Sequence, residues 1–467
     1  MRTKTSHSRR PSSGPGHSAK NAKHPRPKGS RRERYFNFLA KKLGPVTVRG
    51  WLEIFAVVLG VLIAYSILFV RRDAIQYRPD HTFNVRSPEF FSSAHGATDP
   101  VPIGGNKITL LHNGDGTFPV LLKAIRGAQK TVNFEAFLFH SGAVGTEFIR
   151  AFCERAQAGV QVRILLDGIG SGSALDGGDV STMKKAGCKF EYYHPVRAVR
   201  VDRINRRSHR RVLVVDGKVA FTGGIGFADD WLGNADSPDH WRDIHIQVQG
   251  PIVAKFQSAF QQHWLNETQE LLTGADHFPE LKSIGNLRAQ VTSSDEFSVA
   301  AVPLIQAVAI AAAEKTIYIT NPYCTPTEDQ VDLLTAAVQR GVDVRLLLPG
   351  PHNDQPMTKA AGRTGYGKLL KGGVKIFEYT PTMIHSKTMV VDGMFSLLGT
   401  SNLDARSAQI NNEIDLSVYD ESFGAEMDRV FLKDLELSKP YTEGQFKKRG
   451  LWERFSEWAT LPFRSQL

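Results

Sequence analysis

Cysteine is scarce in this chain. Only three occur in 467 residues, Cys153, Cys188 and Cys324. A small domain stapled by disulfides carries a denser and usually even set. The sequence therefore predicts no disulfide framework, and we interpret Cys153 and Cys188 as thiols of the core.

Nucleotide and metal motifs are also missing. The chain has no Gly-x4-Gly-Lys-Ser/Thr loop, and the short run Gly168–Gly172 is better explained as a loop than as a phosphate cradle. No set of His, Cys or paired carboxylates has the spacing of metal ligands. We therefore expect neither a metal nor another cofactor.

Acidic residues are nearly absent from the first 50 positions. This tail holds 14 of the 58 Lys and Arg and a single acid, Glu33, so the rest of the chain is close to neutral. Rich in Ser, Gly, Pro and basic residues, the tail cannot build a core and is expected to be disordered. Its basic residues have no interleaved aromatics for base stacking until Tyr35, Phe36 and Phe38, which lie near the hydrophobic run, so we expect a tether to anionic lipid and no nucleic-acid partner.

Long hydrophobic runs are limited to one. Ile54 to Val70 is a stretch of 17 residues without a charge. With the flanking Trp51 and Leu52 it is just long enough to span a bilayer. A cleaved signal peptide is the alternative, but no small-x-small site follows the run. We predict a transmembrane anchor with a cytoplasmic N-terminus, although the flanking charge bias that sets orientation is small.

One motif, His-x-(basic)-x4-Asp, occurs twice. The copies run from His209 through Arg211 to Asp216 and from His385 through Lys387 to Asp392. Covalent phosphodiester chemistry uses two imidazoles, one to attack phosphorus and one to protonate the leaving oxygen. A single copy is a weak signal, whereas two copies inside matching repeats are a strong one.

The repeats predict an α/β fold with a mixed, largely parallel sheet. Strands rich in Val, Ile and Leu, such as 159–166 and 341–348, alternate with helical stretches in both halves. Side chains alternate along a strand, so each His shares a face with the basic residue two positions on. Asp-Gly pairs at 216–217 and 392–393 predict tight hairpins, and we favour a hairpin role over substrate contact for Asp216 and Asp392.

Small and acidic residues follow each motif. After the second come Gly399-Thr400-Ser401-Asn402 and then Glu413, and after the first come Gly223-Gly224-Ile225-Gly226 and then Asp243. Small residues let backbone amides approach an anion. A carboxylate on the far nitrogen of a catalytic histidine fixes its tautomer and stabilises the imidazolium. We therefore predict Asp243, Asn402 and Glu413 as supporting residues.

These features resemble the phospholipase D superfamily. The resemblance is carried by the paired motifs, the Gly399–Asn402 run and an acid 28 residues after His385. Over residues 106–467 the chain resembles bacterial cardiolipin synthases in particular, most strongly from Ile376 to Ser407. It departs from the family pattern at Arg211, where Lys is usual, and Gly226 stands where the second repeat has Asn402.

The resemblance implies one active site between the halves and no metal. His209 is then the nucleophile that forms a phosphohistidine, and His385 is the acid that protonates the departing alcohol and later deprotonates the incoming one. Arg211, Lys387 and Asn402 stabilise the charge on the pentavalent phosphorus. The expected reaction moves a phosphatidyl group between two phosphatidylglycerol molecules. The alternatives are a hydrolase of phospholipid or nucleic acid and, less favoured, an inactive lipid-binding protein.

The expected organisation has seven parts. They are a basic tail (1–50), an anchor (51–72), a linker (73–105), repeat 1 (106–270), a connector (271–298), repeat 2 (299–430) and a C-terminal amphipathic segment (431–467). The amphipathic segment could lie in a membrane interface or dock on its own domain. A basic insert before His209, 197–208, is either a solvated loop or a gate for anionic headgroups. We expect a bacterial inner-membrane enzyme with phospholipid substrates and infer no obligate protein partner.

Overall fold

The structure is a computed structural model that describes residues 48–69, 79, 81–98, 101–195, 203, 205–294, 301–461 and 466. The chain divides into a unit at residues 1–70 and a second unit at 71–467. The first contains helix α2 (Val48–Phe69). Among the described residues, no helix combines the length and apolarity needed to cross a bilayer. The predicted tail falls almost entirely outside the described residues, as do 70–72 of the predicted anchor.

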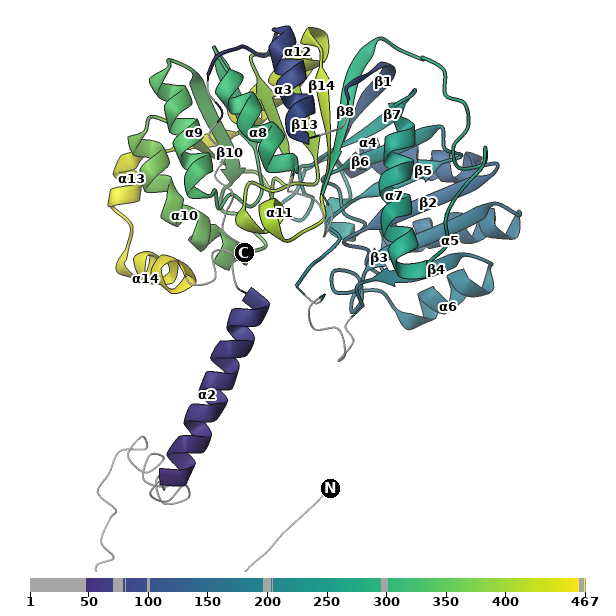
Figure 1. The fold of residues 1–467 in the computed structure, drawn as a ribbon, viewed down its shortest axis with the longest axis horizontal. Coiled ribbons are helices and arrows are strands. Elements are labelled where there is room, and N and C mark those ends of the chain that lie inside the picture. Colours follow the sequence, from purple (N-terminus) through teal and green to yellow (C-terminus); the bar gives the residue numbers. More distant parts are fainter. Residues whose placement is uncertain are drawn as a thin grey trace, which may run out of the picture. The chain divides into compact units, whose positions relative to one another are not determined.

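The second unit is built on a 15-stranded sheet with helices on its faces (Figure 1). The first repeat comprises β1 (Ile103–His112), α4 (Asn113–Gly127), β2 (Thr131–Ala136), α5 (Ala143–Gln157), β3 (Gln161–Asp167), α6 (Gly177–Lys185), β4 (Lys189–Tyr193), β5 (Val212–Val215), β6 (Val219–Gly223), β7 (Ile244–Gln249) and α7 (Val253–Thr268).

The second repeat follows the same order of strands. It comprises β8 (Leu287–Ser293), α8 (Ala301–Ala312), β9 (Thr316–Thr320), α9 (Glu328–Gln339), β10 (Asp343–Pro349), α10 (Pro356–Lys371), β11 (Lys375–Tyr379), β12 (Thr388–Val391), β13 (Phe395–Gly399), α11 (Ala405–Gln409), β14 (Ile414–Tyr419) and α12 (Glu421–Glu436). The chain closes with β15 (Ser438–Tyr441), α13 (Glu443–Lys447) and α14 (Leu451–Thr460).

The strand order makes the duplication visible. From the centre outward the first repeat reads β1-β7-β6-β5-β2-β3-β4, and the second reads β8-β14-β13-β12-β9-β10-β11. The antiparallel pair β1–β8 joins the halves. Parallel pairing is confined to the outer strands β2–β3–β4 and β9–β10–β11, so the expected largely parallel sheet is wrong for the central strands. Short hairpins join β5 to β6 and β12 to β13, and a hairpin can only join antiparallel neighbours.

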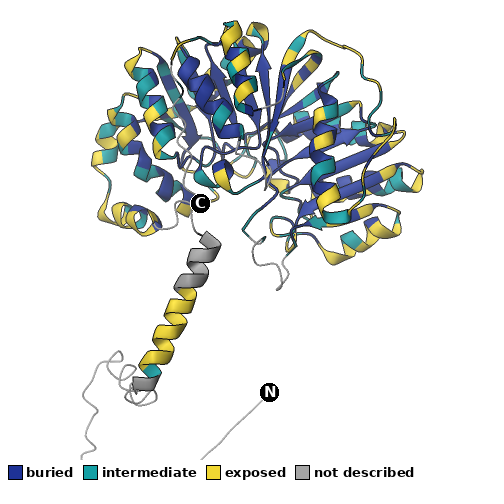
Figure 2. Cartoon of the chain, in the orientation of Figure 1, coloured by how far each residue is buried: buried dark blue, intermediate teal, exposed yellow. Residues whose placement is uncertain are grey.

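The outer strand β2 is buried along its whole length, because helices cover both faces of the sheet (Figure 2). On α5, Val144, Phe148 and Phe152 recur at helical spacing and pack into the same core as β2. Helices α7 and α12 belong to one further core that contains strands from both repeats.

Two segments differ from the expected organisation. Within the predicted linker, Pro88–Thr98 forms helix α3, whose buried Phe90 packs against Phe395 and Tyr419 of repeat 2. Repeat 1 begins at β1, three residues before the predicted boundary, and the predicted connector contains β8.

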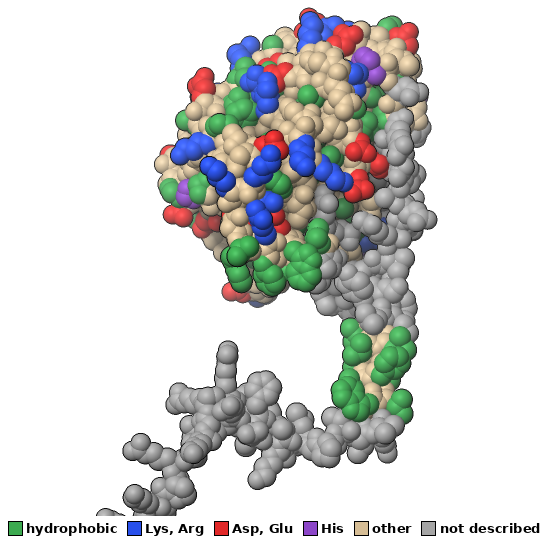
Figure 3. Space-filling model, turned by 90° about the vertical axis from the view of Figure 1, so that its left-hand side faces the viewer, with side chains coloured by type: hydrophobic (Ala, Val, Ile, Leu, Met, Phe, Trp, Pro, Cys, Tyr) green, Lys and Arg blue, Asp and Glu red, His purple; other side chains and the backbone are tan. Residues whose placement is uncertain are grey.

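In the C-terminal segment β15 extends the sheet beside β11, and α14 presents aromatic side chains to solvent (Figure 3).

Candidate active site

The two histidines reach one site because each motif lies beside the other repeat. His209 precedes β5 and His385 precedes β12. The His209 backbone N–H donates to the Asn412 carbonyl (2.9 Å), and the His385 N–H donates to the Arg242 carbonyl (2.8 Å). The matching contacts on each side of the centre place both motifs at the boundary between the halves.

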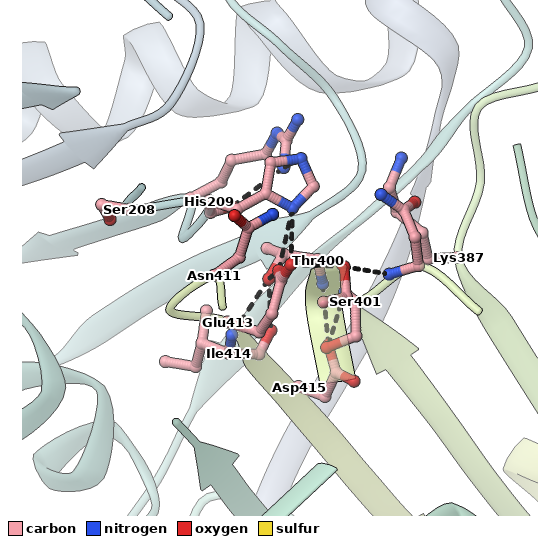
Figure 4. Close-up of polar contacts among 12 residues, drawn as sticks. Ser208, His209, Lys387, Thr400, Ser401, Asn411, Glu413, Ile414 and Asp415 are labelled. Atoms are coloured by element: carbon pink, nitrogen blue, oxygen red, sulfur yellow. Dashed lines mark hydrogen bonds and ion pairs between the residues drawn. The ribbon is translucent and has the colours of Figure 1, made fainter. Parts of the chain in front are cut away.

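Each imidazole is bound by a carboxylate from the opposite repeat. Nδ1 of His209 lies 2.9 Å from both Glu413 oxygens, and Nδ1 of His385 lies 2.9 Å from Asp243 Oδ2 (Figure 4 for the His209 side). All four side chains are buried. Because Nδ1 is engaged, Nε2 of each ring is the nitrogen left for reaction at phosphorus.

The two carboxylates are held by different donors. Thr400 Oγ1 and Ser407 Oγ donate to Glu413 at 2.6 and 2.7 Å. Asp243 instead accepts from Trp231 Nε1 at 2.9 Å and from the Ile244 N–H at 2.7 Å. The two repeats thus support equivalent carboxylates with hydroxyls on one side and an indole on the other.

Two glycines explain why the repeats differ here. Gly224 stands at the position of Thr400, and a Cβ there would lie 2.2 Å from Asp243 Oδ1. Gly226 stands at the position of Asn402, and a Cβ there would lie 2.8 Å from the Trp231 ring. The indole of Trp231 therefore occupies the space that a side chain at position 226 would need.

The basic residues of the motifs share a face with their histidines. Arg211 Nη1 lies 3.3 Å from His209 Nε2, and Lys387 Nζ lies 3.0 Å from both ring nitrogens of His385. Both cations are buried. Asn402 lies in the same buried loop, where its N–H donates to Ser407 Oγ and its Oδ1 has no partner among the described residues.

Asp216 and Asp392 lie at the hairpins and not beside the histidines. Asp216 and Gly217 have φ values of 52° and 62°, and Asp392 and Gly393 have 53° and 60°, as a tight hairpin requires. Each carboxylate accepts three backbone N–H groups at the start of a neighbouring strand. The four-residue strand after each motif carries the acid away from the histidine, and both carboxylates bind the backbone beside the hairpins.

Burial and charge make the two His–carboxylate pairs unequal. Burial, reinforced by Arg211 and Lys387, holds the pKa of His209 well below its usual value. Burial and Lys387 lower the pKa of His385 to about 4, against the opposing effect of Asp243. Both imidazoles are therefore neutral at neutral pH, and a phosphodiester anion between them favours protonation.

The carboxylates themselves shift in opposite directions. Burial raises the pKa of Glu413 to about 7, although hydrogen bonds from Thr400 and Ser407 oppose the rise. Burial also acts on Asp243, but the hydrogen bond and charge of His385 outweigh it and bring its pKa to about 2. Asp243 is thus a full anion at neutral pH, whereas Glu413 is near its midpoint.

Aromatic side chains surround the histidines. Phe137 meets the His209 ring edge-on at 5.1 Å, and Trp231, Trp241 and Tyr323 lie 5.1, 5.4 and 5.8 Å from the His385 ring. Such walls reduce the access of water to the reacting phosphorus. Our sequence prediction missed Phe137 and Trp231, and it did not name Thr400 or Ser407 as donors to a carboxylate.

The basic insert is only partly described. Residues 196–202 and 204 lie outside the described residues. Arg207 is buried and pairs with Asp167 (3.4 Å), so it cannot serve as a gate for headgroups. Among the described residues, no group of three or more His, Cys, Asp or Glu is arranged to hold a metal ion. The expectation that no metal takes part stays a prediction.

Two α/β repeats that share paired histidines define an enzyme of the phospholipase D superfamily. The family model "Cardiolipin synthase, PLD-like domain" matches residues 121–264 and 307–435. Cardiolipin synthase A of Pseudomonas syringae pv. syringae is 36% identical over 341 residues, 72% of this chain and 70% of that protein. Cardiolipin synthase 1 of Bacillus cereus is 32% identical over 362 residues, 74% and 70% of the two chains.

The fold also has a solved counterpart. The crystal structure of phosphatidylserine synthase from Haemophilus influenzae Rd KW20 aligns with a TM-score of 0.59 and 14% identity, covering 81% of this chain and 100% of that one. At this identity the likeness establishes the fold alone. With the family match and the sequence relatives, the chain belongs to the cardiolipin synthase family.

Proposed function

We propose that this enzyme transfers a phosphatidyl group from one phosphatidylglycerol to another through a phosphohistidine, with release of glycerol. The observation that carries the proposal is the pair of buried histidines, each bound at Nδ1 by a carboxylate of the opposite repeat so that Nε2 is left for chemistry at one phosphorus. A nucleophile must be neutral when it attacks, whereas a general acid must hold a proton. With the phosphodiester anion bound, the Asp243 anion favours the imidazolium of His385, whereas burial and the nearby Arg211 and Lys387 keep His209 neutral.

In the first step, Nε2 of His209 attacks phosphorus. A P–N bond forms, the bond to the glycerol oxygen breaks, and His385 delivers its proton to that oxygen. The positive charge on the phosphorylated imidazole faces Glu413, whose ionised carboxylate accepts the Nδ1–H of His209 and acts as the counter-ion. Arg211 and Lys387 offset the charge that develops on the equatorial oxygens.

In the second step, the roles of His385 reverse. It takes the proton from a headgroup hydroxyl of a second phosphatidylglycerol, whose oxygen attacks the phosphoenzyme and releases neutral His209. The product is cardiolipin. If water entered instead, the product would be phosphatidic acid, so the aromatic walls around both rings favour transfer over hydrolysis.

We also propose that residues 51–72 anchor the enzyme in the bacterial inner membrane as a single pass. The 17-residue uncharged run supports this, and the basic tail before it suits the cytoplasmic, anionic leaflet. The catalytic unit then lies on the opposite side. Retention in the membrane pellet after an alkaline wash, lost when residues 1–72 are deleted, tests the anchor.

Trapping the phosphoenzyme tests the chemistry. When the phosphate of phosphatidylglycerol is labelled, the protein should acquire an acid-labile label, and this label should map to His209. With His385→Ala, natural substrates should not turn over, whereas a substrate with a good leaving group should still label the protein. Label on His385, or full activity of His385→Ala, would contradict the assigned roles.

A further inference from the structure

Helix α14 docks on its domain through its polar face and leaves its apolar face exposed. Glu457 and Thr460 are buried, while Trp452 and Trp458 are 77% and 67% exposed. A terminal helix that stabilises its own domain normally buries its apolar stripe. Here the apolar stripe is left outside, so its aromatic side chains do not serve the packing of this domain.

Ion pairs hold the inward face. Glu453 binds Arg363 of α10 at 3.0 Å, and Glu457 binds Arg449 at 2.9 Å. These contacts fix the helix so that the opposite face points away from the domain. Figure 3 shows hydrophobic side chains gathered on this side of the molecule, with Lys and Arg side chains nearby.

The exposed face has the composition of a helix that lies in a membrane interface. Trp and Phe carry large apolar rings, and the Trp N–H suits the headgroup region. Basic side chains beside such a face bind anionic headgroups. Exposed aromatic and aliphatic residues form this face, with exposed basic residues next to it: Leu451, Trp452, Phe455, Trp458 and Leu461, and Lys447, Lys448 and Arg454. Of the basic residues, Lys447 also pairs with Glu443.

The chain after α14 leads to the rim of the active site. Gln466 accepts from Asn205 Nδ2 (3.0 Å) and from Arg406 Nη1 (3.3 Å). Asn205 lies four residues before His209, and Arg406 precedes Ser407, which binds Glu413. Leu461 and Gln466 are five positions apart in the sequence, so the chain between them spans at most about 18 Å. The aromatic face therefore lies close to the site.

We propose that α14 docks the catalytic unit on an anionic phospholipid bilayer and brings the rim of the active site to the lipid headgroups. The inference rests on the proposed function for its purpose, since a bilayer lipid must enter the site. The partner that covers the exposed face of α14 is the bilayer surface itself. A second copy of the chain is the competing occupant, and the experiment separates the two.

Quenching by brominated lipid tests the docking without reference to activity. The full chain is reconstituted in vesicles of phosphatidylcholine and phosphatidylglycerol, with or without bromine on the acyl chains. Trp452→Phe/Trp458→Phe keeps the apolar face and removes its emission. The wild type should lose a larger fraction of its fluorescence to bromine than this variant. Equal fractions would overturn the proposal, because the quenched emission would then come from other tryptophans such as Trp51.

Turnover tests the consequence. The variant Trp452→Ser/Phe455→Ser/Trp458→Ser should lose at least about tenfold of its turnover of bilayer phosphatidylglycerol. Turnover of a dissolved short-chain phosphatidylglycerol should be retained. Leu271→Ser/Ile284→Ser removes exposed apolar side chains elsewhere and should affect neither substrate.

Other outcomes are distinguishable. Equal loss with both substrates would mean that α14 supports the fold. A wild-type dimer that the serine variant dissociates, with equal bromine quenching of the wild type and Trp452→Phe/Trp458→Phe, would assign the face to a second copy. Either result overturns the docking. A wild type that turns over neither substrate refutes the proposed function, and the quenching result still decides the docking.

Discussion

Replacing Asp243 by Asn should damage one chemical step and spare the other. The carboxylate lies 2.9 Å from His385 Nδ1 and is fully ionised, with a pKa of about 2. Asn keeps the size and can still accept a hydrogen bond, but it removes the charge that stabilises the imidazolium. Proton donation to the leaving alcohol should therefore weaken, whereas attack by His209 should not.

The magnitude follows from the loss of one charge pair. Opposite charges about 4 Å apart at an effective dielectric constant of about 20 attract by about 4 kcal/mol. At 1.36 kcal/mol per factor of ten, this corresponds to about a 10³-fold lower rate when the leaving group needs a proton. A p-nitrophenolate leaving group needs none, so its release in the first turnover should fall by less than about tenfold.

The assay compares two substrates in each of two variants. Asp243→Asn is measured by the burst of p-nitrophenol from a phosphatidyl p-nitrophenyl ester and by turnover of phosphatidylglycerol. Glu413→Gln is the matched control, because Glu413 supports the nucleophile on the other side. It should slow both reactions by a similar factor. A burst that falls as far as phosphatidylglycerol turnover in Asp243→Asn would refute the assignment of His385 as the acid.

Three further outcomes are expected. Arg211→Lys should stay within about tenfold of wild-type kcat/KM, whereas Arg211→Ala should lose about 10²-fold or more, because the charge at phosphorus matters more than its geometry. Equal losses in the two variants would contradict this expectation. Asp434 binds Arg242 at 3.0 Å, and Asp434→Ala leaves the Arg242 charge buried and unpaired. The free energy of unfolding, measured by chemical denaturation, should fall by about 3 kcal/mol. An unchanged denaturation midpoint would show that the ion pair makes no net contribution to stability. Ser407→Ala removes a hydrogen bond that lowers the pKa of Glu413, so this pKa should rise further above about 7. Because Glu413 then ionises only at a higher pH, the acidic limb of the pH–rate profile should move up by about one pH unit. An unmoved limb would mean that Glu413 does not titrate in the rate-determining form.

The repeated motif predicted much of the site because its parts are local. The His209–Arg211 and His385–Lys387 pairs follow from the two-residue period of a strand, and the hairpins follow from Asp-Gly. The crossing of the carboxylates does not follow. It depends on how β1 and β8 join the halves, and no pattern within one repeat encodes that contact.

The donors to the carboxylates illustrate a signal that was present but unused. Trp231 follows Gly223 by eight residues, and Ser407 follows Gly399 by eight. Aligning the repeats therefore pairs the indole of Trp231 with the hydroxyl of Ser407. Both side chains donate a hydrogen bond to a carboxylate, but they belong to different residue classes, and this difference hid the match.

Helix α14 shows the opposite limit. Its spacing indicates an apolar face, but the sequence cannot say which face docks. That depends on Arg363, about 90 residues earlier, and on Arg449, which bind its glutamates. In α3 a helix start signal was available, since Pro88 stands at its first position, but the aromatic partners lie in repeat 2.

The central claim is tested most directly by giving the purified full-length protein phosphatidylglycerol alone in detergent micelles and identifying the products. We predict cardiolipin and free glycerol in equal amounts, both lost in His209→Ala. Phosphatidic acid without cardiolipin, or cardiolipin formed undiminished by His209→Ala, would contradict transfer through a phosphohistidine at this site.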